Sequence, residues 1–240
     1  MAIGDAKTNT FTEEGRILQV EYAIKNVSQA GTIVGLNCND GVLLLGIKKG
    51  AVQSFKEKIY KLSEGIYCCV CGIFPDALQI VQYARVNAQN FLEEFGTSMP
   101  VSTLARKVGE LKQGFTQSGG MRPFGVSFLY AGIKDNQYLL YSTDPSGTCN
   151  AWKGKAYGEF EDAINNGFKN DLSDDNKTFK EGLKSLIQII SKSRECNEES
   201  APLFEVLHLS KDGCKFLTNE EIINVFKEIE KDEKMKNEKK

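Results

Sequence analysis

The chain has 240 residues, with 30 lysines and arginines against 32 aspartates and glutamates, and 41% of its residues are hydrophobic. This balanced charge gives no electrostatic reason for binding nucleic acid or anionic lipid, because both require clustered positive charge. No apolar run is long enough to span a membrane or to form a secretory signal, and no stretch reads as a linker between domains. We therefore expect one soluble domain of the cytoplasm and nucleus, whose partners are proteins or peptides and neither nucleic acid nor membrane.

An irregular arm over residues 1–16 is expected to lead into the first helix. Gly15 interrupts regular structure, and apolar residues then recur at helical spacing. These residues are Ile17, Val20, Ala23, Ile24 and Val27. Because Gly31 is a residue type that commonly caps a helix end, we expect a helix of about 14 residues.

Strands and two long helices follow in the first half of the chain. Residues 32–38 and 42–47 are expected to form a hairpin around Asn39-Asp40-Gly41, because Asp-Gly tolerates the positive dihedral angles of tight turns. Residues 66–71 read as a buried strand. One helix should then begin at Pro75-Asp76 and stop at Gly96, and a second should run from Pro100 to Gly119-Gly120.

The second half repeats the same kinds of elements. Strands are expected at residues 125–133, 138–141 and 151–156, helices at 162–170 and 179–193, a hairpin at 204–217 and a terminal helix around 222–229. The tail over residues 231–240 alternates both charges and cannot form a core. Strands in short hairpins, separated by helices, predict an α+β fold in which two antiparallel sheets lie between helix layers.

The seven cysteines do not indicate a metal site. Cys68, Cys69 and Cys71 fall within the predicted buried strand, and the chain has one histidine, His208, within an apolar strand-like stretch. A zinc site would need further ligands, and no phosphate-binding loop with a lysine is visible. We therefore interpret these thiols as small core residues and expect no cofactor and no metal.

Five short stretches resemble, in order, the motifs of proteasome alpha-type subunits over about residues 5–230. They are Phe11-Thr12-Glu13-Glu14-Gly15-Arg16-Ile17-Leu18-Gln19-Val20-Glu21-Tyr22-Ala23, Gly31-Thr32, Glu57-Lys58-Ile59-Tyr60-Lys61-Leu62, Arg122-Pro123-Phe124-Gly125 and Asp144-Pro145-Ser146-Gly147. The resemblance implies the four-layer αββα sandwich of N-terminal-nucleophile hydrolases, as one domain over residues 17–230 between a gate arm (1–16) and the charged tail (231–240). Within the family, residues 105–119, 151–153 and 228–231 look most like alpha type 7, and types 2 and 4 are alternatives.

The same resemblance implies a noncatalytic subunit of the 20S core particle. Such subunits form a ring with other alpha subunits, stack on beta subunits and admit unfolded polypeptides for ubiquitin-dependent and other protein degradation. The beta subunits attack with an N-terminal threonine assisted by an aspartate and a lysine. Here Thr32 is internal and residues 46–49 contain no carboxylate, so Lys58 has no catalytic partners. Two alternatives are a threonine hydrolase that cleaves itself before Thr32 and a free-standing scaffold domain.

Two of the sites that the resemblance implies lie in the arm and the first helix. In the family a Tyr-Asp pair, a proline and a later tyrosine organise the gate. Asp5 and Tyr22 match this pattern, whereas Gly4 and Glu13 depart from it and predict a more mobile arm. The first helix is expected to assemble the ring through Ile17, Val20, Ile24 and Val27.

The third implied site is a pocket between neighbouring alpha subunits that receives the C-terminal tails of activators or regulatory particles. Lys58, Gly72 and Asp76 match the family positions that line it. A lysine suits this task because its compact ammonium can pair with a terminal carboxylate, and a glycine leaves the backbone approachable.

Overall fold

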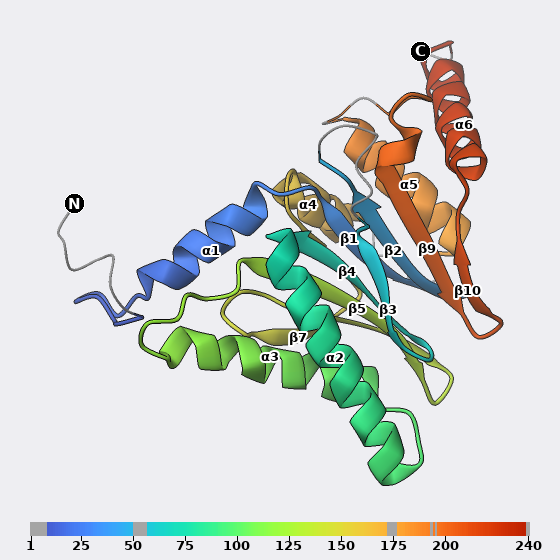
Figure 1. Ribbon diagram of the computed structural model, residues 1–240. Helices are drawn as coiled ribbons and strands as arrows, with labels where there is room; N and C mark the ends of the chain where they lie inside the picture. Colours follow the sequence, from blue (N-terminus) through green and yellow to red (C-terminus); the bar gives the residue numbers. More distant parts are fainter. Residues whose placement is uncertain (1–8, 50–56, 172–176, 193, 195, 239–240) are drawn as a thin grey trace.

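The computed structural model describes residues 9–49, 57–171, 177–192, 194 and 196–238. Two five-stranded antiparallel sheets are stacked face to face (Figure 1). The first sheet has the order β10 (Gly213–Phe216), β9 (Phe204–Ser210), β2 (Gly41–Ile47), β1 (Ile33–Cys38) and β8 (Gly154–Tyr157). The second has the order β3 (Ile59–Ser63), β4 (Ile66–Gly72), β5 (Val126–Lys134), β6 (Gln137–Thr143) and β7 (Cys149–Trp152).

Helices cover the outer face of each sheet. The long pair α2 (Phe74–Phe95) and α3 (Val101–Gln117) packs on the second sheet, while α4 (Glu161–Asp171), α5 (Phe179–Ser191) and α6 (Asn219–Glu238) pack on the first. A short 3₁₀ turn, η1 (Ala201–Leu203), precedes β9. This order of layers confirms the predicted αββα sandwich.

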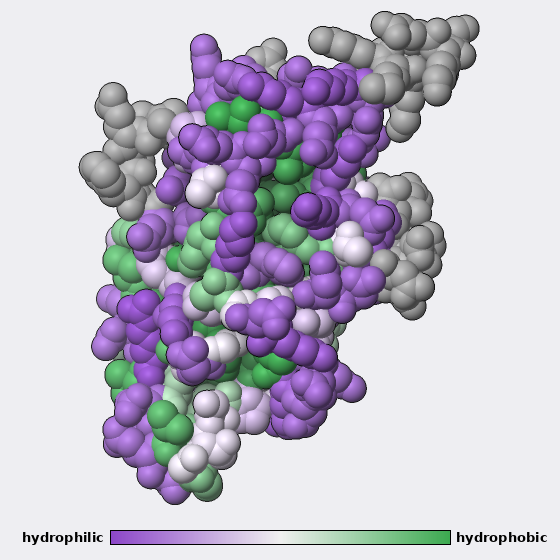
Figure 2. All heavy atoms as spheres, turned by 90° about the vertical axis from the view of Figure 1, so that its right-hand side faces the viewer, coloured by the Kyte–Doolittle hydropathy of each residue, from purple (hydrophilic) through white to green (hydrophobic). Residues whose placement is uncertain are grey.

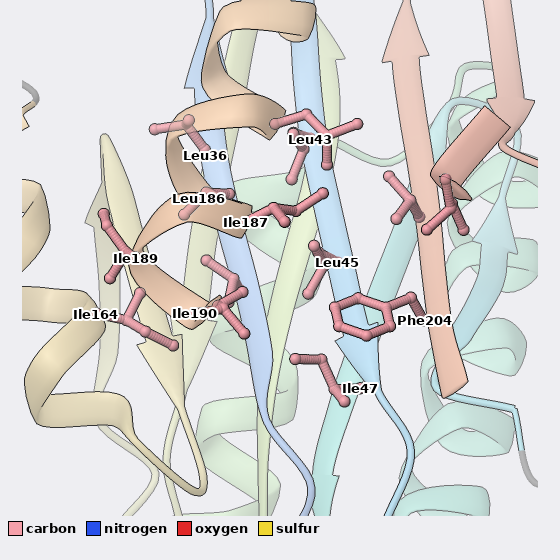
Figure 3. Close-up of a cluster of buried hydrophobic side chains, with 14 of the residues drawn as sticks. Leu36, Leu43, Leu45, Ile47, Ile164, Leu186, Ile187, Ile189, Ile190 and Phe204 are labelled. Carbon is pink, nitrogen blue, oxygen red and sulfur yellow. The ribbon is translucent and has the colours of Figure 1, made fainter. Parts of the chain in front are cut away.

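The core has three layers because each sheet buries both of its faces. Figure 3 shows the layer outside the first sheet, where Leu186, Ile187 and Ile190 of α5 meet Leu43 and Leu45 of β2. Strands buried on both faces read as continuous apolar runs, which is why residues 42–47 are almost entirely hydrophobic. Figure 2 shows that the side of the molecule bearing α6 is mostly hydrophilic, with apolar patches between the hydrophilic residues. None of the described helices is both long and apolar enough to cross a membrane.

The predicted hairpins are confirmed, but one turn differs from the expectation. Cys38 pairs with Gly41 across the β1–β2 turn, as predicted, yet Asn39, Asp40 and Gly41 do not adopt positive φ. The left-handed pair is instead at the β5–β6 turn, where Asp135 and Asn136 have φ of 49° and 63°. Short polar side chains tolerate this conformation, so the Asp-Asn pair serves there without a glycine.

Three other expectations were wrong in detail. The structure has two strands, β7 and β8, where one strand was expected over residues 151–156, and the two belong to different sheets. Lys153 separates them, and its carbonyl oxygen accepts a hydrogen bond from the Asn37 N–H (2.7 Å). Strand β3 was not predicted. Helix α1 (Leu18–Ser28) ends at a Gln29 cap with right-handed dihedrals, and Gly31 is not in the left-handed region. At the other end of the chain, α6 continues to Glu238, so most of the expected charged tail has a helical backbone.

Candidate functional site

Lys58, just before β3, extends its side chain between the two sheets. Its stem passes beside Gly46 of β2, where an added Cβ would lie 2.5 Å from the Lys58 Cβ. The Nζ donates to the carbonyl oxygens of Gly31 (2.9 Å) and Val70 (3.2 Å). An ammonium has three donors, so within the described part of the chain one remains for a ligand.

A cavity of about 370 Å³ opens beside this ammonium. Its lining is Ala30, Gly31, Lys48, Lys49, Glu57, Lys58, Val70, Gly72, Phe74 and Pro75. Two further lysines therefore join Lys58: Lys48 lies 3.7 Å from a Glu205 oxygen, and Lys49 lies 3.2 Å from a Glu159 oxygen. Lys48 and Lys49 are each paired with a glutamate outside the lining, whereas the described ion pairs include none for Lys58, so its ammonium is the group at this cavity suited to an anion. We call it the Lys58 cavity.

Gly72 lines the Lys58 cavity, and its conformation requires glycine. Its φ is 128°, and an added Cβ would lie 2.1 Å from the Gly125 carbonyl oxygen. The backbone of β4 and of the segment after Arg122 therefore approach each other closely here. Gly72 allows that approach and leaves the cavity unobstructed by a side chain.

Asp76, the third residue named for the pocket between subunits, is not in the lining of this cavity of the single chain. It is buried near the start of α2, and its carboxylate accepts two bonds from Arg122 (2.6 and 2.7 Å) and one from the Gly125 N–H (3.0 Å). Burial raises the pKa of Asp76, but the bonds from Arg122 and Gly125 outweigh it and hold this pKa below the ordinary value. Asp76 thus fastens the Arg122-Pro123-Phe124-Gly125 motif to α2.

The predicted gate residues are not brought together in the described structure. Asp5 lies outside the described residues. Glu13 is exposed in a turn closed by the Thr12 N–H to Arg16 carbonyl bond (2.8 Å) and the Gly15 N–H to Thr12 carbonyl bond (2.9 Å). The turn therefore forms without proline. Tyr22, on the outer side of α1, is 53% exposed.

The four predicted ring-assembly residues differ in burial. Val27 is only 2% exposed and packs into the core between the sheets, so it belongs to this subunit's own interior. Ile17 and Val20 are half-buried, and Ile24 is 43% exposed. With Tyr22 and with Phe11, which is 74% exposed, Ile24 leaves an unusual amount of apolar surface around α1, which stands out from the sheets (Figure 1).

Asn9, which the sequence did not indicate, fastens the arm to the end of α3. Its Nδ2 donates to the carbonyl oxygens of Phe115 (2.8 Å), Met121 (3.0 Å) and Ser118 (3.3 Å). Carbonyls at a helix C-terminus lack partners within the helix, and an asparagine amide can satisfy them. No local pattern signals this role, because Asn9 and α3 are far apart in sequence.

The region matching a threonine hydrolase site lacks its chemistry. The Thr32 hydroxyl is buried and donates to the Glu159 carbonyl oxygen (2.5 Å). At Gly31 an added Cβ would lie 2.4 Å from the Ile47 carbonyl oxygen, so no side chain fits there without movement of β2. Ile47, in the segment where an aspartate would be needed, is a buried hydrophobic residue.

The clustered cysteines are core residues of β4. Cys68, Cys69 and Cys71 are buried free thiols. Burial raises the pKa of Cys71 to about 12, and it raises the pKa of Cys68 and Cys69 as well. His208 lies on β9 with its ring stacked on Phe179, 4.0 Å between centroids, as a strand residue rather than a base.

Comparison with known proteins agrees with these observations. The family model of proteasome subunits matches residues 27–208, and the model of the N-terminal signature of A-type proteasome subunits matches residues 5–25. The chain is 52% identical over 223 residues to the probable alpha type-3 proteasome subunit of Encephalitozoon cuniculi, covering 93% of this chain and 96% of that protein. It is 38% identical over 197 residues to the alpha type-3 proteasome subunit of Saccharomyces cerevisiae (80% and 76%) and 38% identical over 221 residues to the alpha type-4 proteasome subunit of Spinacia oleracea (88% of each).

Proposed function

The chain belongs to the proteasome subunit family as an alpha-type member, a noncatalytic ring component of the 20S core, and we propose that its Lys58 cavity docks the C-terminal carboxylate of an activator. The observation that carries this proposal is the Lys58 ammonium. Two carbonyls fix its position at the cavity, and no third acceptor for it lies among the described residues. A carboxylate would complete its hydrogen bonds beside Lys48 and Lys49, which are each paired with a glutamate.

The second part of the proposed function is ring assembly and control of substrate entry by the arm and α1. We infer that the exposed apolar side chains of Phe11, Tyr22 and Ile24 contact neighbouring subunits of the ring, because such surface is costly on a lone chain. Asn9 would then set the point from which the preceding residues restrict the entry of unfolded polypeptides.

We propose the cytoplasm and nucleus as the compartments of this particle. For the subclass, the relatives above bear type 3 and type 4 names, and we propose one of these two types in place of the expected type 7.

The test of docking is Lys58→Ala in the assembled core particle. Activator affinity should fall about tenfold or more, because a hydrogen bond to a charged group contributes about 1.5–3 kcal/mol. Basal peptide hydrolysis should be unchanged, since catalysis belongs to other subunits. The matched control is Lys61→Ala, which removes an exposed lysine of β3 that pairs with Glu64 outside the cavity. Equal activator affinity of wild type and Lys58→Ala would refute the docking role.

The alternative of a self-processed threonine hydrolase has a direct test. Cleavage before Thr32 would remove the arm and all of α1, including Val27, which packs in the core. Intact mass of the subunit in the particle should show residues 1–31 retained. A chain that begins at Thr32 would instead support the hydrolase.

A further inference from the structure

Glu205 of β9 reaches from the first sheet to the strand that carries Lys58 in the second. Its Oε2 accepts the backbone N–H of Lys58 (2.9 Å), and its Oε1 accepts the backbone N–H of Ile59 (3.1 Å). The carboxylate is largely buried, and Lys48 Nζ lies 3.7 Å from Oε2. One carboxylate thus accepts bonds from two consecutive backbone N–H groups that belong to another sheet.

These bonds matter because β3 is an edge strand. Its inner edge pairs with β4, where the Lys58 carbonyl accepts the Val70 N–H (2.9 Å). The outer edge has no neighbouring strand among the described residues, so its N–H groups need partners from elsewhere. Glu205 accepts one charge-assisted hydrogen bond from the backbone N–H of Lys58 and one from the backbone N–H of Ile59, next to the Cα from which the Lys58 side chain extends to the cavity.

Gly46 leaves space for the side chain of the same lysine. Gly46 and Glu205 are partners in the antiparallel register of β2 and β9, and the missing side chain of Gly46 makes room for the Lys58 stem. One cross-strand pair therefore fixes both the backbone of Lys58 and the path of its side chain. The ammonium is held at the cavity by contacts that do not involve the ligand.

We propose that Glu205 is a positioning residue that acts through Lys58 to make the cavity select a free carboxylate over a neutral chain end. This inference rests on the proposed docking function of Lys58. A lysine with four flexible torsions loses rotamer freedom when it binds, and fixing its Cα and stem beforehand reduces that loss. Glu205 is not in the lining of the cavity, so it has no direct role with the ligand.

The experiment compares two synthetic peptides on core particles that carry variant subunits. Both have the same short sequence with an apolar last residue, and one ends in a free carboxylate while the other ends in an amide. Fluorescence anisotropy gives Kd for each, and the ratio of the amide Kd to the acid Kd measures carboxylate selection. A general loss of stability would weaken both peptides and leave this ratio unchanged.

Wild type should prefer the acid about tenfold, corresponding to about 1.4 kcal/mol, and Lys58→Ala should abolish the preference. Glu205→Ala should lose most of it, and the double variant should lose no more than Lys58→Ala alone, because Glu205 acts through Lys58. The matched control is Glu64→Ala, which removes a carboxylate that pairs with Lys61 outside the cavity and should keep the wild-type ratio.

The outcomes separate the two ideas. If Lys58→Ala keeps the ratio, the docking function fails, and the positioning role fails with it. If Lys58→Ala loses the ratio but Glu205→Ala keeps it, only the positioning role is overturned. Should Glu205→Ala not assemble, Glu205→Gln keeps the volume and one acceptor oxygen and should show an intermediate ratio. A ratio equal to or above wild type in Glu205→Gln would mean that release of Lys48 dominates, and would overturn the proposal.

Discussion

Lys112 of α3 is fully buried in the core between the helix pair and the second sheet, and it should make stability depend on pH. Its Nζ donates to the Val126 carbonyl (2.9 Å) and to the carbonyl and hydroxyl oxygens of Thr143 (3.2 and 3.0 Å). The ammonium also lies 4.8 Å from the centre of the Phe128 ring. The described ion pairs include none for Lys112, although Asp144 raises its pKa from a distance.

Burial lowers the pKa of Lys112 from 10.5 to about 7 in the folded chain. Below pH 7 both the folded and the unfolded chain hold the proton, and the folded chain bears the full cost of a buried charge. Between pH 7 and 10.5 only the unfolded chain holds it, so the free energy of unfolding rises by about 1.4 kcal/mol per pH unit. Over the whole interval the gain approaches about 5 kcal/mol, and above it the cost is gone.

The measurement is urea unfolding of the recombinant chain and of Lys112→Met at several pH values. Because other groups titrate in both proteins, the quantity of interest is the difference between them. From about pH 7 to pH 9 the wild type should gain about 2–3 kcal/mol relative to Lys112→Met. Lys107→Met, at a partly exposed position of the same helix, controls for the loss of a lysine. Parallel curves for wild type and Lys112→Met would refute the reasoning and mean that the three oxygens keep the proton on Lys112.

Two smaller perturbations test the backbone near the site and a helix cap. Gly72→Ala should lower the free energy of unfolding by about 2–4 kcal/mol, because the added Cβ would lie 2.1 Å from the Gly125 carbonyl oxygen. The control is Gly114→Ala in α3, where the added Cβ has open space and should raise the free energy of unfolding by about 0.5–1 kcal/mol. Equal effects of the two substitutions would contradict the requirement for glycine at residue 72. Thr178→Ala should lower the free energy of unfolding measured in urea by about 1 kcal/mol, because Thr178 and Glu181 form a capping box at the start of α5. An unchanged free energy of unfolding would mean that the cap is dispensable.

Most helices and hairpins could be predicted because their signals are local. Gly96 ends α2 with a left-handed cap at φ 67°, as its position after an apolar stripe suggested. Residues 149–157 could not be divided in the same way, because a stretch of small and aromatic side chains suits either sheet and only tertiary pairing decides which strand joins which sheet. Strand β3 was missed because it has only five residues and does not alternate strictly: Ile59 and Tyr60 are both buried, so the period of two is broken.

The site shows the same division between local and distant information. Lys58 and Gly72 were found through motifs, but Lys48 and Lys49 join them only because β2 ends at the same cavity. Asp76 was named from the family resemblance as well, but it is not in the lining of the Lys58 cavity in the single chain. One turn of α2 instead brings its carboxylate to Arg122, far along the chain.

The geometry around Gly31 bears on the proposed docking. Lys58 donates to the Gly31 carbonyl, which lies within the peptide that links α1 to β1. A side chain at residue 31 would lie 2.4 Å from the Ile47 carbonyl oxygen and 3.3 Å from Lys58 Nζ, so it would clash and also fill the approach to the ammonium. Glycine at both Gly31 and Gly72 keeps that approach open. Glycine at residue 31 therefore leaves Lys58 accessible to the carboxylate that we propose it binds, while Thr32, which follows it within the chain, has no free amine for catalysis.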